Sequence, residues 1–108
     1  MLSDLFDDGR KVSLSEPIII GRSPIALANV PGATLFPIDD PTMSVSSTHL
    51  VVGHDASGLW VQDTGSTNGS SIILPSGQTF ELLPGVRGAL DIGSRVKFGE
   101  RSFQVVNR

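Results

Sequence analysis

The sequence has 108 residues, enough for one domain that buries a core without covalent cross-links. It contains no cysteine, which excludes disulfides and thiolate metal sites, and its net charge of -3 disfavours the phosphate backbone of nucleic acids as a ligand. No stretch approaches the roughly 20 apolar residues of a membrane helix, and the N-terminus lacks a signal-peptide pattern. We therefore expect a cytoplasmic domain that does not insert into membranes.

Short apolar stretches separated by 12 glycines and 7 prolines predict an all-β domain. In Leu59–Asp63 we read two interleaved faces with the period of a strand, and in Ser102–Val106 the apolar Phe103 and Val105 alternate with Ser102, Gln104 and Val106. Turn signals recur about every 8–12 residues, as in a β-sandwich or barrel. The spacing favours one domain over residues 1–108, with predicted strands at Lys11–Leu14, Pro17–Arg22, Leu35–Ile38, His49–His54, Leu59–Asp63, Ser71–Leu74, Thr79–Leu83, Arg95–Phe98 and Ser102–Val106.

The sequence also predicts the turns between these stretches. Asp8-Gly9 predicts a hairpin near the N-terminus, because this dipeptide favours tight turns between strands. The segments Asp55–Gly58 and Pro75–Gly77 predict two further strand connections. The irregular stretch Ser23–Asp40 predicts a long loop around one edge strand.

Three polar segments stand at predicted strand ends. Gly21-Arg22 ends the first strongly apolar strand, Ser46–His49 precedes another strand, and Asp63–Ser70 follows the strand that holds Trp60. Loops from different strands converge at the rims of a sandwich, so these segments are candidates for one binding site.

The side chains in these segments suit a phosphate group and a peptide. Arginine binds phosphate through two parallel N–H bonds, and hydroxyls and turn N–H groups bind its remaining oxygens. An asparagine amide supplies one donor and one acceptor, as a peptide backbone requires. The types of residue therefore indicate a phosphopeptide site. Arg22 would be its main cation, because no lysine or arginine occurs between Arg22 and Arg87.

The order and spacing of the motifs resemble those of the forkhead-associated (FHA) domain. The resemblance lies in Gly21-Arg22, in Ser46-x-x-His49 and in Gly65–Gly69, and it continues through the predicted closing strands to Val106. It implies a sandwich of two mostly antiparallel sheets (FHA/SMAD-like), with binding loops at one rim. It also implies a phosphothreonine-dependent interaction module in Ser/Thr kinase signalling, which is not an enzyme and needs no cofactor.

The resemblance assigns roles to individual residues. It places Arg22 and Ser46 on the phosphate, Thr67 at the wall of the phosphothreonine pocket, and Asn68 on the peptide main chain. Ser47 also belongs to the implied phosphopeptide-binding set, although many relatives carry arginine, lysine or asparagine there. The expected partner is a phosphothreonine-containing protein, either a kinase substrate or the kinase itself.

Three further residues are implied to support the site. Gly21 would let the chain turn, His49 would brace the loop from behind, and Gly69 would adopt a positive φ. The serine at position 47 leaves Arg22 as the single full positive charge, which predicts modest affinity. It also keeps open an alternative, a phosphate-independent FHA-like scaffold or interaction domain.

The same residues also raise two other hypotheses, a hydrolase triad and a metal site, and the sequence argues against both. Ser46, His49 and Asp63 have the residue types of a hydrolase triad, but no G-x-S-x-G elbow accompanies them. His49 and His54, with Asp55, have the residue types of metal ligands, but the two histidines are five positions apart and lie on opposite faces of a strand, which argues against a shared metal.

Overall fold

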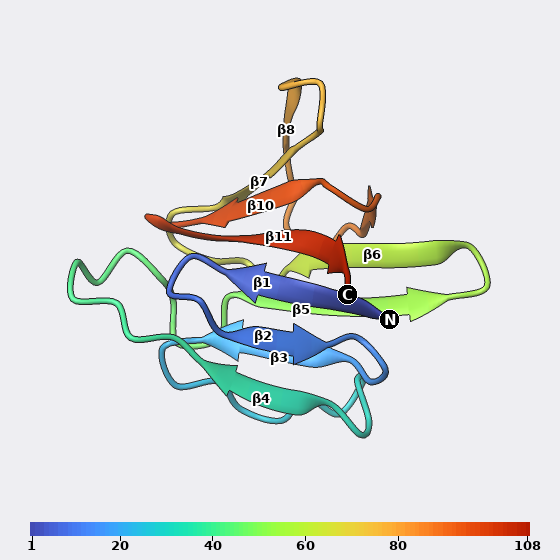
Figure 1. The fold of residues 1–108 in the computed structure, drawn as a ribbon. Coiled ribbons are helices and arrows are strands. Elements are labelled where there is room, and N and C mark those ends of the chain that lie inside the picture. Colours follow the sequence, from blue (N-terminus) through green and yellow to red (C-terminus); the bar gives the residue numbers. More distant parts are fainter.

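The computed structural model describes all 108 residues. They form eleven strands, with their connections, in two packed sheets (Figure 1). The first sheet has the order β2-β1-β11-β10-β7-β8, and the second has the order β4-β3-β5-β6-β9. The strands are β1 (Leu2–Phe6), β2 (Lys11–Ser13), β3 (Ile18–Gly21), β4 (Thr34–Pro37), β5 (Leu50–Asp55), β6 (Gly58–Asp63), β7 (Ser70–Ile73), β8 (Thr79–Glu81), β9 (Gly88–Leu90), β10 (Arg95–Phe98) and β11 (Arg101–Asn107). The structure has no helix long and apolar enough to cross a membrane.

The predicted sandwich of mostly antiparallel sheets is confirmed. One pair, β3 with β4, runs parallel, and the others run antiparallel. The predicted long loop around an edge strand is also correct, because β4 lies at the edge of its sheet and is flanked by irregular chain.

The core fills the space between the sheets with aliphatic and aromatic side chains. The Phe6 ring stacks on Phe36 with centroids 4.4 Å apart, and Phe98 and Phe103 pack beside it. Residues of β3, β5 and β6 that face inward, such as Ile18 and Val61, are fully buried. Burial of this apolar surface provides the main driving force for folding.

A second, smaller cluster explains why β3 is apolar on both faces. Ile19, Val51 and Trp60 lie on the outer face of the second sheet, where part of the loop between β3 and β4 covers them. The Trp60 ring packs directly over Gly53, where a Cβ would lie 2.5 Å from the ring. The Arg87 guanidinium also stacks on the Trp60 ring, 3.8 Å from the ring centroid.

The pairing of strands brings several chain segments to one rim of the sandwich. β3 and β6 end there, β5 and β7 begin there, and β10 turns into β11 there. Figure 1 shows these connections together on its left-hand side. The three polar segments identified in the sequence therefore meet, although up to 49 positions separate them, counting from Gly21 to Ser70.

Candidate binding site at the strand-end rim

Arg22 follows β3 directly and is held against the loop that precedes β5. Its backbone N–H donates to the Ser46 carbonyl at 3.1 Å, and its Nε donates to the Val45 carbonyl. Arg22 lines a cavity of about 110 Å³, and its Nη1 lies 3.8 Å from the sulfur of Met43. The backbone thus orients the arginine and leaves N–H groups free for a ligand.

The sequence-predicted residues Ser46, Thr67 and Asn68 line the same cavity as Arg22. The Thr67 N–H donates to the Ser46 Oγ at 3.1 Å, and the Asn68 side-chain amide donates to the Ser44 carbonyl at 2.9 Å. These bonds connect the two loops that form the cavity. Ser47 does not line this cavity; its side chain is exposed, and its carbonyl accepts a hydrogen bond from the Ser23 N–H.

His49 lies beneath both loops and is fully buried. Its Nδ1 accepts a bond from the Ser46 N–H at 3.0 Å, so the proton of the neutral ring lies on Nε2. Nε2 donates toward the Gly69 carbonyl at 3.0 Å. Burial lowers the pKa of His49, and the Gly69 carbonyl and nearby carboxylates only partly oppose this.

The geometry around His49 differs from that of a hydrolase triad. His49 bonds to the backbone of Ser46, while the Ser46 hydroxyl accepts from Thr67. A triad instead needs an accessible serine whose hydroxyl is hydrogen-bonded to the histidine ring. The hydroxyl that contacts the His49 ring is that of Ser70, at 3.1 Å from Nε2, and it is buried. The arrangement fixes two loops together and offers no activated nucleophile.

Asp63 organises the loop after β6, a role that the sequence analysis did not assign. Its Oδ1 accepts from the N–H groups of Gly65 and Ser66, and its Oδ2 accepts from the hydroxyls of Ser66 and Ser70. Burial alone would raise the pKa of Asp63, but these hydrogen bonds outweigh it and hold the pKa below its usual value. The Asp-x-x-Ser pattern of an Asx turn was the available sequence signal.

Asp40 has the same function in the loop before β5. Its carboxylate accepts from the Val45 N–H at 2.7 Å and from the hydroxyls of Thr42 and Ser44. Burial would raise the pKa of Asp40, but these bonds lower it. Met43, at the tip of this loop, has a φ of 57°, which is unusual for a residue with a side chain.

The two glycines of the motifs serve different purposes. Gly69 has a φ of 75°, as predicted, which suits glycine. Gly21 does not have a positive φ, so a left-handed backbone is not what this position requires. Its role is close approach, because a Cβ at this position would overlap the Ser47 carbonyl.

Comparison with known proteins gives matches at the level of structure. No family model and no curated protein sequence matches the chain. The chain is similar to the FhaA FHA domain complexed with the intracellular domain of Rv3910, at 25% identity and a TM-score of 0.68 over 97% of this chain and 99% of that one. It is also similar to the Rv0020c FHA structure, at 26% identity and a TM-score of 0.64 over 97% and 90% of the two chains.

A human protein shows the same fold. The FHA domain of human APLF, solved with an XRCC1 bisphospho peptide, matches at 21% identity and a TM-score of 0.68 over 99% of this chain and 98% of that one. The fold and the rim define a β-sandwich interaction module. The chain therefore has the β-sandwich fold of FHA domains.

Proposed function

We propose that this domain binds phosphothreonine-containing segments of partner proteins at the rim cavity, with Arg22 and Ser46 on the phosphate. The observation that carries the proposal is the placement of Arg22, whose Nε is held by the Val45 carbonyl and which lines one cavity together with Ser46 and Thr67. Charge-assisted hydrogen bonds from such a preorganised arginine suit a phosphate dianion. The phosphopeptide bound to the APLF domain supports the same use of this fold.

The other residues of the rim take complementary roles in this proposal. Asn68 binds the peptide main chain, Thr67 shapes the pocket, and Met43 offers apolar surface for the threonine methyl group. Ser47 is peripheral, so binding of the phosphate depends on a single cation, Arg22. Gly21, His49 and Gly69 act by holding the loops. The partner is a substrate of a Ser/Thr kinase, or the kinase itself.

An oriented peptide library with a fixed phosphothreonine tests this function, with Arg22→Ala as the control. The selected sequence is then made with phosphothreonine, phosphoserine and unmodified threonine. We expect binding of the phosphothreonine peptide, loss of binding without phosphate, and roughly fivefold weaker binding of phosphoserine, because one methyl group contributes about 1 kcal/mol.

The same three peptides separate the proposal from a phosphate-independent interaction domain. The serine at position 47, where a second cation is missing, is the feature that favours this second function. Equal binding of the phosphorylated and unmodified peptides would establish it. Equal binding of phosphoserine and phosphothreonine would instead remove only the preference for threonine.

A further inference from the structure

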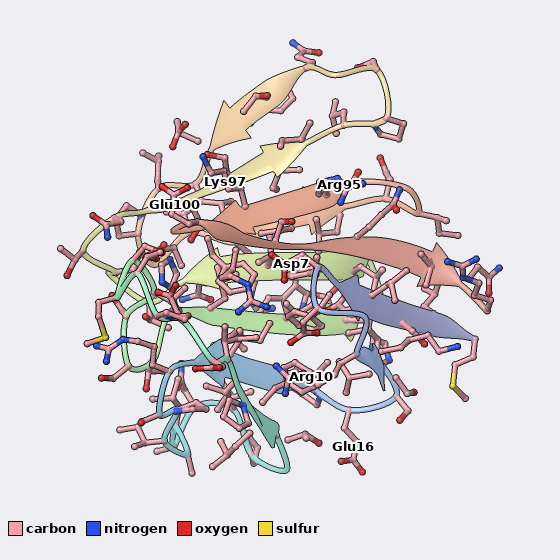
Figure 2. All side chains as sticks on the ribbon, turned by 60° about the vertical axis from the view of Figure 1, so that its left-hand side comes forward. Asp7, Arg10, Glu16, Arg95, Lys97 and Glu100 are labelled. Atoms are coloured by element: carbon pink, nitrogen blue, oxygen red, sulfur yellow. The ribbon has the colours of Figure 1, made fainter.

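A second polar cavity lies on the same rim, next to the candidate phosphate site. It has a volume of about 410 Å³, and none of its lining residues is hydrophobic. Ser44 and Asn68 line both cavities, so the two share a wall. The charged residues of the second cavity are Glu81, Lys97 and Glu100. Figure 2 shows Lys97 and Glu100 near each other where β10 turns into β11.

The shared wall holds the second cavity in a fixed position relative to Arg22. The Ser44 carbonyl accepts from the Asn68 amide at 2.9 Å, and the Ser44 hydroxyl accepts from the Glu100 N–H at 2.8 Å. At Gly99, a Cβ would lie 2.5 Å from the Ser44 carbonyl oxygen, so the turn packs directly on the loop backbone. The distance between the two cavities is therefore already fixed before a ligand that spans both of them binds.

The charges of this cavity favour a cation. Strand register places Glu81, Ser71 and Lys97 in one row across β8, β7 and β10. Glu81 accepts a hydrogen bond from the Ser71 hydroxyl at 2.9 Å, whereas the Glu100 carboxylate and the Lys97 ammonium make neither a hydrogen bond nor an ion pair. Two carboxylates against one ammonium give a formal charge of -1.

We propose that this cavity binds a lysine or arginine side chain of the phosphorylated partner and so selects a basic residue close to the phosphothreonine. The inference rests on the proposed function, since binding of the phosphate beside Arg22 is what brings the flanking peptide residues to the second cavity. A segment with a phosphate dianion and a nearby cation matches a rim with Arg22 on one side of the wall and two carboxylates on the other. Glu100 can pair with the incoming cation without breaking an existing ion pair.

The test uses short peptides with one fixed phosphothreonine, in which each flanking position carries Arg, Lys, Ala, Gln or Glu. We expect the wild-type domain to bind Arg or Lys about two- to fivefold more tightly than Ala at one flanking position, as for an exposed ion pair. The double variant Glu81→Gln/Glu100→Gln should lose this preference, and Glu100→Lys should favour Glu instead. Glu16→Gln is the matched control, because Glu16 is exposed and lies far from the cavity in Figure 2.

Two outcomes overturn the inference while leaving the proposed function intact. One is phosphate-dependent binding with no basic preference, or with a preference for acidic residues that pair with Lys97. The other is a basic preference that survives in the Glu81→Gln/Glu100→Gln double variant. If the wild-type domain binds no member of the set, the proposed function fails as well.

Discussion

Replacing Arg22 with alanine should weaken binding of a phosphothreonine peptide by about tenfold to a hundredfold or more, while the domain stays folded. Arg22 is the only cation at the cavity, and a charge-assisted hydrogen bond contributes roughly 1.5–3 kcal/mol. The side chain is half-buried at the rim and outside both apolar clusters, so its loss removes little packing. Calorimetric titration with the library-selected peptide measures the effect.

Two further variants separate charge from geometry at this position. Arg22→Gln can still donate to the Val45 carbonyl but carries no charge, so it should bind almost as weakly as Arg22→Ala. Arg22→Lys keeps the charge but loses the planar pair of donors, and should fall between wild type and Arg22→Ala. Arg95→Ala, an exposed cation on β10 away from the cavity, is the matched control and should bind normally. Undiminished affinity of Arg22→Ala would exclude this site.

The stability of the domain should fall as the pH rises through the neutral range, because of Asp4. Strand alternation turns Asp4 inward with Phe6, and neither of its carboxylate oxygens has a hydrogen-bond partner. Its neighbours across the strands, Val12 and Val105, both belong to or pack on the core. Burial raises the pKa of Asp4 from 3.8 to about 8, so the folded protein holds this proton at pH 7.

The sign of the effect follows from the two pKa values. Between about pH 4 and pH 8 the folded state binds the Asp4 proton and the unfolded state does not, so the free energy of unfolding decreases by about 1.4 kcal/mol per pH unit from this group. Asp4→Asn removes the titration without changing the shape of the side chain.

Urea unfolding of wild type and Asp4→Asn from pH 5 to pH 7.5 measures this contribution. We expect the wild type to lose about 3 kcal/mol relative to the variant over this range. His49, Asp40 and Asp63, whose lowered pKa values make stability fall toward acid pH, are present in both proteins and cancel in the difference. Parallel pH profiles would show that Asp4 is solvated or paired in solution.

The sequence predicts most of the strands because their local patterns are strong. Ile18–Ile20 is continuous and apolar, and the structure buries it on both faces. Two strands were absent from the predicted set. β1 carries buried Ser3 and Asp4, which obscure its alternation, and β9 is a three-residue strand that begins with glycine. Pairing with β11 and with β6 defines these strands, and a local pattern does not contain that information.

The candidate site shows the same division between local and long-range information. Motif order identifies Arg22, Ser46, Thr67 and Asn68, and the structure places all four around one cavity. Two charged residues of the second cavity, Glu81 and Lys97, come together through the register of β8, β7 and β10, which the sequence does not reveal. Likewise, the close contact at Gly21 depends on how two distant loops pack.

Amide NMR spectra recorded during titration with the selected phosphothreonine peptide test the central claim most directly. We expect the shift changes to concentrate on Arg22, Ser46, Thr67 and Asn68, and to disappear when the same peptide carries unmodified threonine. Shift changes confined to the apolar groove between β8 and β9, which Phe80 lines, would contradict the claim, as would equal changes with both peptides.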